Sequence, residues 1–173
     1  MFGGGEIVSD VKVLFFDDDG VIPNHPSLPV LLYEHALIDR KDKIETIFHN
    51  HNWKNSWVNG IYDFHHYHSN AHEVLGIIKG CARLQLGGPK GENIVVHAGD
   101  VIVLPAGTGH KRLQSTADFQ VVGAYPGGMS YNLKTGNSAE YTEAVEQIED
   151  VPLPKTDPVY GEDGPLLSLW SKE

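Results

Sequence analysis

The sequence predicts an all-β fold, a single barrel or sandwich with two flanking helices, and three observations support this prediction. Turn-forming Gly, Pro, Asn and Asp residues interrupt most of the 173-residue chain. The segments between them are short and rich in β-branched and aromatic residues, which is typical of strands. The length suits one domain that buries a core of its own.

Nine segments have this strand pattern, and seven of them follow one another closely between Ile61 and Tyr125. A dense series of short strands favours a barrel or a sandwich. In chain order, the predicted strands are Val11–Phe16, Pro29–Leu37, Ile61–His68, Glu73–Lys79, Cys81–Leu86, Asn93–His97, Asp100–Leu104, His110–Gln114 and Phe119–Tyr125.

Two helices are predicted outside this series, because apolar residues recur there at spacings of three and four. They are Lys41–His51 and Ser138–Ile148, the second with Asn137 as a capping residue. The chain therefore divides into an N-terminal extension (1–28), the barrel domain (29–126) and a C-terminal helix with an extended strap (127–173). The strap ends in an apolar group that packs either on its own domain or on a second subunit, and both interpretations stay open.

Charge and composition exclude several classes of partner. The net charge is −10 and Lys and Arg are not clustered, so we expect no nucleic-acid partner. The segment Met1–Glu6 lacks the positive charge and apolar stretch of a signal peptide, and no apolar run reaches the roughly 18 residues of a membrane span. A lone cysteine, Cys81, forms no internal disulfide. We expect a cytoplasmic protein without membrane partners.

Histidine spacing identifies the candidate functional residues. Six of the ten histidines fall within 24 consecutive residues. His66 and His68 are two positions apart in a predicted strand, so their side chains share one face and their Cα atoms lie about 6–7 Å apart. Two imidazoles at that separation can bind one metal ion. His65 and Tyr67 would face the opposite way.

Two neighbouring segments supply further candidate ligands. Glu73 begins the next strand after a short connection, so its carboxylate returns to the same end of the domain. His72 is the alternative at this point, because strand alternation lets only one of the pair face the site. His110 follows the Pro105–Gly107 turn at the start of another strand. The sequence thus predicts a metal site with three imidazoles and one further ligand.

These passages resemble the paired signature of the cupin superfamily. Its first half is Gly, five residues, His-x-His, three or four residues, Glu, six residues, Gly. Its second half is Gly, five residues, Pro-x-Gly, two residues, His, three residues, Asn. The chain has Gln114 at the last position and matches the other nine with Gly60, His66, His68, Glu73, Gly80, Gly99, Pro105, Gly107 and His110. The flanking segments look similar to small single-domain bacterial cupins of the YjlB type.

The resemblance implies a single cupin barrel, the double-stranded β-helix or jelly roll, over about residues 29–126. It favours Glu73 over His72 and implies one divalent transition metal per chain. Iron, manganese, nickel and zinc all accept imidazole and carboxylate ligands, so the metal stays open. Cupin barrels often pair through their sheets, which implies a homodimer. The implied metal ligands are His66, His68, Glu73 and His110.

Four protein ligands leave two positions of an octahedral ion open, as in a catalytic site. Dioxygenase and isomerase chemistry are the commonest activities that the resemblance implies, and the substrate would be a small polar or anionic metabolite. The alternative is a non-catalytic module that holds a metabolite or a metal ion, because no residue is placed as a separate general base. The substrate-pocket candidates are Tyr62, Phe64, Arg112 and Gln114.

Overall fold

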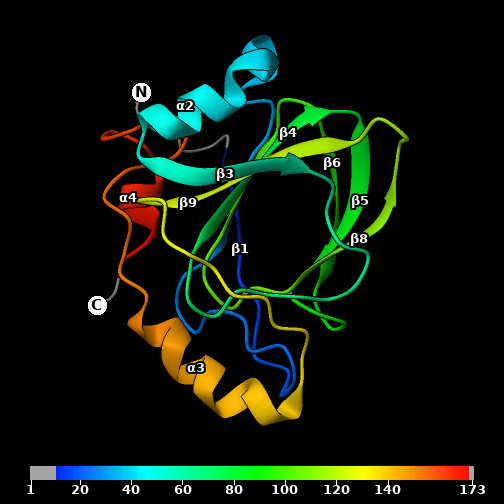
Figure 1. Ribbon diagram of the computed structural model, residues 1–173, viewed down its shortest axis with the longest axis vertical. Helices are drawn as coiled ribbons and strands as arrows, with labels where there is room; N and C mark the ends of the chain where they lie inside the picture. The colour runs from blue at the N-terminus through cyan, green and yellow to red at the C-terminus, as the bar shows by residue number, and fades with distance from the viewer. Residues whose placement is uncertain (1–10, 172–173) are drawn as a thin grey trace, which may run out of the picture.

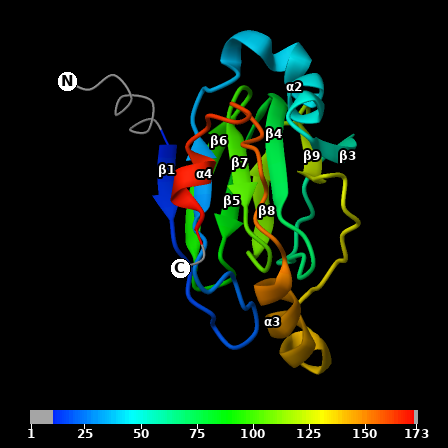
Figure 2. The same ribbon diagram turned by 90° about the vertical axis from the view of Figure 1, so that its left-hand side faces the viewer.

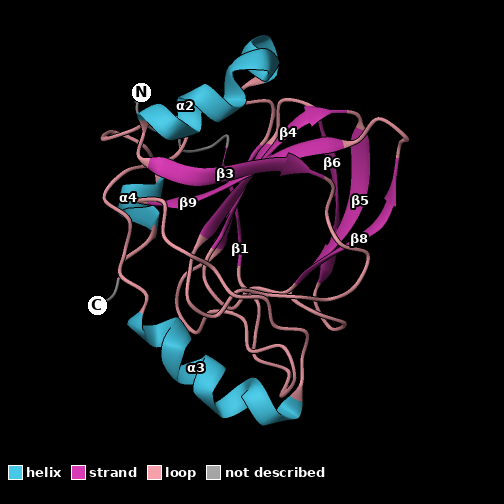
Figure 3. Cartoon of the chain, in the orientation of Figure 1, coloured by secondary structure: helices cyan, strands magenta, loops and turns pink. Residues whose placement is uncertain are grey.

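The computed structural model describes residues 11–171 and shows a mostly β protein with two antiparallel sheets (Figures 1 and 3). The Met1–Glu6 segment lies outside these residues. In spatial order the larger sheet contains β1 (Val11–Leu14), β2 (Val30–Tyr33), β7 (Val101–Leu104), β4 (Glu73–Lys79), β9 (Gln120–Pro126) and β3 (Trp53–Asn59). The smaller sheet contains β6 (Glu92–His97), β5 (Cys81–Leu86) and β8 (His110–Ser115). The β-rich prediction is confirmed.

The predicted strand Ile61–His68 is wrong. Its β-pairing consists of two isolated bridges, from His66 to His110 and from Tyr67 to Lys134. These two bridges use successive residues, so the local alternation of side chains survives although no strand forms. The strand that occupies the sheet edge is β3, which the sequence pattern missed. A register shift between Lys54 and Trp57 interrupts β3, which obscures the period-two pattern.

The central strands of the larger sheet are buried on both faces. Along β7, Ile102 and Leu104 point toward the smaller sheet, whereas Val101 and Val103 point to the opposite face. The first set joins a core between the two sheets, and the second joins a core that α2 (Ile44–Asn50) and the C-terminal segment cover. Figure 2 shows the C-terminal segment beside β1 and β2 and α2 at one end of the strands. Burial on both faces explains why this strand is continuously apolar.

Both predicted helices are confirmed, each with a short 3-10 segment before it. They are η1 (Ile38–Lys43) with α2, and η2 (Ser138–Glu140) with α3 (Tyr141–Asp150). The Asn137 side chain accepts a hydrogen bond from the Ala139 N–H at 2.9 Å, as a cap does. A further short helix, α4 (Leu166–Leu169), lies in the predicted strap. Within residues 11–171, every helix is too short or too polar to cross a membrane.

The C-terminal strap packs on its own sheet. Leu166 and Trp170 are buried in the same core as Tyr33, and the Trp170 Nε1–H donates to the Pro29 carbonyl at 2.9 Å. Asp157 organises this segment, because its fully buried carboxylate accepts hydrogen bonds from the Tyr33 hydroxyl at 2.5 Å and from three backbone N–H groups. The structure therefore supports the interpretation that the strap packs on its own domain.

We expect Tyr33→Phe to lower the free energy of unfolding by about 1.5–3 kcal/mol, because a buried carboxylate loses a charge-assisted hydrogen bond. Chemical denaturation monitored by fluorescence measures this change. Tyr62→Phe is the control, because Tyr62 is 54% exposed and its variant should stay within about 0.5 kcal/mol of the parent. Equal losses in the two variants would contradict a structural role for the Tyr33–Asp157 pair.

Candidate metal centre

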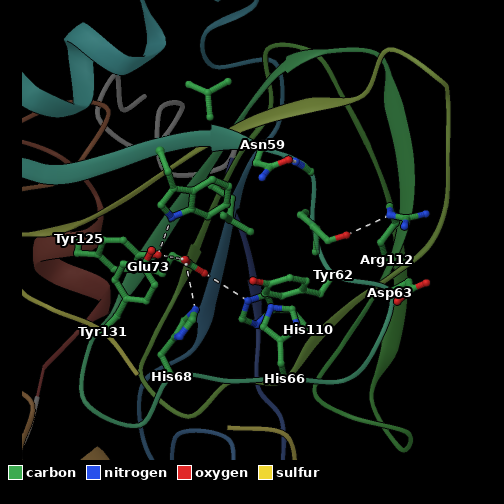
Figure 4. Close-up of a pocket in the computed structure, with 15 residues that line it drawn as sticks. Asn59, Tyr62, Asp63, His66, His68, Glu73, His110, Arg112, Tyr125 and Tyr131 are labelled. Carbon is green, nitrogen blue, oxygen red and sulfur yellow. Dashed lines mark hydrogen bonds and ion pairs between the residues drawn. The ribbon is translucent and has the colours of Figure 1, made fainter. Parts of the chain in front are cut away.

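Three residues from three parts of the chain form the centre of the site. His68, Glu73 and His110 each offer a ligand atom, and these atoms lie within 4.8 Å of one another (Figure 4). The Nε2 atoms of His68 and His110 each lie 3.3 Å from a different oxygen of the Glu73 carboxylate. All three side chains are buried. This group is of the size and composition that binds a divalent transition metal.

Helix α3 supports the loop that carries His68 and the turn that precedes His110. Ser69, beside His68, donates from its hydroxyl to Gln147 of α3 at 2.5 Å. Gly107 lies in the turn before His110 with φ of +89°, and a Cβ there would lie 2.5 Å from the Ile148 side chain. Glycine therefore lets α3 pack closely against this turn. Figure 1 shows α3 below these loops, at one end of the sheets.

All three predicted histidines have the same tautomer. Their Nδ1 atoms contact backbone carbonyls, at 2.9 Å for His66 and Phe64 and at 3.0 Å for His110 and Thr108, and His68 contacts the Asn132 carbonyl in the same way. A carbonyl only accepts, so each Nδ1 carries a hydrogen, and in the neutral form of each ring the lone pair is on Nε2. Metal-binding imidazoles are oriented in this manner.

His66 lies beside the central group without belonging to it. Its ring centroid is 4.0 Å from that of His110 and 6.1 Å from that of His68. Burial, together with the nearby His110, lowers the pKa of His66 to about 3, so its ring stays neutral. A neutral ring at this position is available as the fourth ligand that the sequence predicts.

The electrostatics of the centre depend on one carboxylate. Burial alone would raise the pKa of Glu73, but attraction to His68 and His110 holds that pKa below its usual range. Burial likewise disfavours a charge on His68, and the Glu73 carboxylate outweighs this effect and raises the pKa of His68. Glu73 therefore stays ionised.

The residues fit a divalent ion. Although His110 lies nearby, the buried Oε1 atom of Glu73 accepts no hydrogen bond from any described residue. A buried, ionised oxygen without a donor is costly, and a cation compensates it. The donor set of imidazole nitrogens and one carboxylate suits iron, manganese, nickel and zinc.

Two other histidines lie outside the centre. His72 is buried, but its Nδ1 accepts from the Ala106 N–H at 2.9 Å and its Nε2 contacts the Pro152 carbonyl. Glu73, and not His72, therefore faces the centre. His65 lies close to Lys111 and Asp19 and does not line the pocket. These positions agree with the predicted alternation of side chains.

A cavity of about 530 Å³ opens beside the centre. Of the predicted pocket residues, Tyr62 and Arg112 line it. Phe64 does not line it but stacks on Tyr62, with ring centroids 4.9 Å apart. Gln114 is exposed and lies outside the cavity, so the prediction of Gln114 as a pocket residue is wrong.

A bulge explains the position of Gln114. Leu84 of β5 pairs with Arg112 and the preceding Arg83 pairs with Gln114, so Leu113 is an extra residue on β8. The extra residue shifts the alternation by one. Arg112 therefore points inward with the buried Leu84, and Gln114 points outward with the exposed Arg83.

Three aromatic residues of the cavity were not predicted as pocket residues. Trp57 and Tyr125 come from the adjacent strands β3 and β9, and Tyr131 follows in the next loop. The Tyr125 and Tyr131 rings stack with centroids 4.1 Å apart. Tyr125 ends a predicted strand, so the sequence could have indicated its position at the end of the sheet. Trp57 belongs to β3, which the sequence pattern did not predict.

Comparisons with known proteins agree with the signature. A family model described as "Cupin domain" matches residues 58–120. The chain is 48% identical over 163 residues to "Uncharacterized protein YjlB" of Bacillus subtilis (strain 168), covering 94% of this chain and 98% of that protein.

Solved structures show more distant similarity. One is acireductone dioxygenase from Bacillus anthracis with a cadmium ion in its active center, which is 19% identical with a TM-score of 0.36 and covers 54% of this chain. This chain spans 62% of that structure. Another is the WlaRB TDP-quinovose 3,4-ketoisomerase from Campylobacter jejuni, 14% identical with a TM-score of 0.40, covering 53% of this chain and 73% of that one.

We expect alanine at His66, His68 or His110 to weaken metal binding at least about 10–100-fold, the cost of losing even an outer partner of a metal ligand. Metal analysis after loading with Mn²⁺, Fe²⁺, Ni²⁺ or Zn²⁺ and dialysis measures the loss. His65→Ala should retain the metal because His65 lies outside the pocket. His72→Ala should lower thermal stability and also retain the metal. Equal metal loss in the His65 and His66 variants would refute the assignment.

Proposed function

Because the chain belongs to the cupin family and to the group that includes YjlB of Bacillus subtilis, we propose that it is a metal-dependent enzyme acting on a small polar or anionic molecule. The observation that carries this proposal is the buried His68, Glu73 and His110 group opening into a cavity of about 530 Å³. A structural metal site is closed, whereas a catalytic one keeps positions open. His66 is the proposed fourth ligand.

The bound ion would polarise a substrate oxygen, and dioxygenase and isomerase reactions both use this chemistry. The protein's own part is to hold the donor atoms and exclude water. The carbonyls behind the histidines orient the rings, and aromatic side chains line the cavity beside them. A single divalent charge next to one carboxylate leaves a net positive centre, which attracts an anionic ligand.

Arg112 provides a second positive group on the cavity wall. Its Nε–H donates to the Ile61 carbonyl at 3.1 Å, which fixes the guanidinium, and no carboxylate of the described chain lies within ion-pairing distance. Figure 4 shows Arg112 across the cavity from Glu73. A guanidinium that a carbonyl orients and no internal carboxylate pairs with is suited to a substrate carboxylate. Tyr62 lies between the two and would contact the body of the substrate.

We expect Arg112→Gln to weaken the binding of small dicarboxylates to the Mn²⁺-loaded protein about tenfold or more, because a charge-assisted hydrogen bond is lost. Calorimetric titration with a series from oxalate to glutarate measures the affinities and shows which length spans the cavity. Lys111→Gln is the matched control, because it removes the same charge from the preceding residue, which does not line the cavity. Equal weakening in both variants would mean general electrostatic attraction and no carboxylate site at Arg112.

We expect purified protein to carry about one divalent transition metal per chain. Screening of Fe²⁺-loaded protein for oxygen uptake and for isomerisation of small hydroxy and oxo acids tests the proposed activity. Protein that takes up no Mn²⁺, Fe²⁺, Ni²⁺ or Zn²⁺ would contradict the metal site. Protein that binds metal and ligands without turnover of any of them would contradict the enzyme and identify a binding module.

Three finer expectations belong to the same proposal. We propose that the two sheets close into the cupin barrel, that the chain forms a homodimer and that it acts in the cytoplasm. The dimer predicts a mass in light scattering of twice the 19.0 kDa of one chain, and a mass near 19 kDa would overturn it.

A further inference from the structure

A chain of hydrogen bonds reaches the Glu73 carboxylate from the side opposite the histidines. The Trp57 Nε1–H donates to the Tyr125 hydroxyl at 2.8 Å, and that hydroxyl donates to Glu73 Oε2 at 2.5 Å. Figure 4 shows Tyr125 on the side of Glu73 that faces away from His110. The three side chains come from β3, β9 and β4, which are neighbours in the larger sheet.

Only one assignment of donors and acceptors is possible for these two hydrogen bonds. The indole nitrogen of Trp57 is a donor only, so the Tyr125 oxygen must accept from it. The single hydroxyl hydrogen of Tyr125 is then free to point at Glu73, which as a carboxylate only accepts. Trp57 thereby orients a donor toward one particular oxygen of Glu73.

The packing around Trp57 holds this arrangement in place. A Cβ at Gly123 would lie 2.2 Å from the Trp57 ring, so only glycine leaves room for the indole over β9. The Tyr125 ring is fully buried and stacks on Tyr131. Neither ring of the hydrogen-bonded chain can turn away without disturbing its neighbours.

The two oxygens of Glu73 therefore differ. Oε2 accepts from Tyr125, whereas the buried Oε1 accepts no hydrogen bond within residues 11–171. We propose that Tyr125, oriented by Trp57, is a positioning residue. Its hydroxyl hydrogen-bonds Oε2, so that Oε1 is the oxygen available to bind the metal. Glu73 then contributes one oxygen to the metal. This inference rests on the proposed metal site and assigns Trp57 and Tyr125 a role that the family signature does not include.

Spectroscopy of the Co²⁺-loaded protein tests this role. We expect Tyr125→Phe to raise the Kd for Co²⁺ about tenfold, as loss of an outer partner of a metal ligand does. With Oε2 released, Glu73 can bind through both oxygens, which changes the coordination of Co²⁺ and should change its visible d–d absorption. Trp57→Phe should cause a smaller change of the same kind. The double variant should match Tyr125→Phe alone within about twofold, because Trp57 acts through Tyr125.

Tyr131→Phe is the matched control. It removes a hydroxyl from the ring stacked on Tyr125, and this hydroxyl makes no hydrogen bond in the described part of the chain. Its Co²⁺ spectrum and Kd should equal those of the parent. Circular dichroism verifies folding, and if Tyr125→Phe does not fold, the spectrum of Trp57→Phe decides.

Three results would overturn the inference. They are an unchanged spectrum in Tyr125→Phe, an equal change in Tyr131→Phe, and a Trp57→Phe effect that persists in full in the double variant. If the parent protein binds Co²⁺ and any of these three results is found, only the role of Tyr125 and Trp57 is contradicted, and the proposed function stands. A parent protein that binds no Co²⁺ contradicts the metal site and this inference together.

Discussion

A carboxylate buried between two sheets is the constraint on which the site depends. Glu73 begins β4 with its side chain pointing toward the smaller sheet, where an uncompensated charge is costly. His68, His110 and Tyr125 lie around it and compensate that charge. Each of these groups is itself held by a backbone carbonyl or by Trp57. The site is therefore positioned by one connected set of polar contacts.

The same type of contact occurs on the other face of the larger sheet, with a different outcome. There the Tyr33 hydroxyl donates to Asp157, and backbone N–H groups satisfy the remaining acceptor positions on both carboxylate oxygens. At Glu73 one oxygen has no hydrogen-bond donor. The two buried tyrosine–carboxylate pairs thus differ in whether both carboxylate oxygens accept hydrogen bonds. The satisfied Asp157 stabilises the C-terminal segment, whereas Glu73 has one oxygen that can bind a ligand.

Much of the fold and the candidate ligands could be predicted from the sequence. Strands such as β4 and β7 follow from local composition, and α2 and α3 follow from apolar spacing. The spacing of His66 and His68 predicted side chains on one face, and both residues line the cavity, although their segment pairs through single bridges and is no strand. The position of β3 could not be predicted in the same way, because its register shift removes the periodic signal.

The sequence by itself determined the β-rich fold, the two helices and the set of candidate ligands, because periodicity, turn residues and motif spacing are local properties. Only the tertiary structure decided which residues share the cavity. A single extra residue in β8 turns Gln114 outward while Arg112 stays inside, and Trp57 reaches Glu73 only because β3 and β4 both pair with β9. Such arrangements depend on the register between distant strands, and no local pattern records that register.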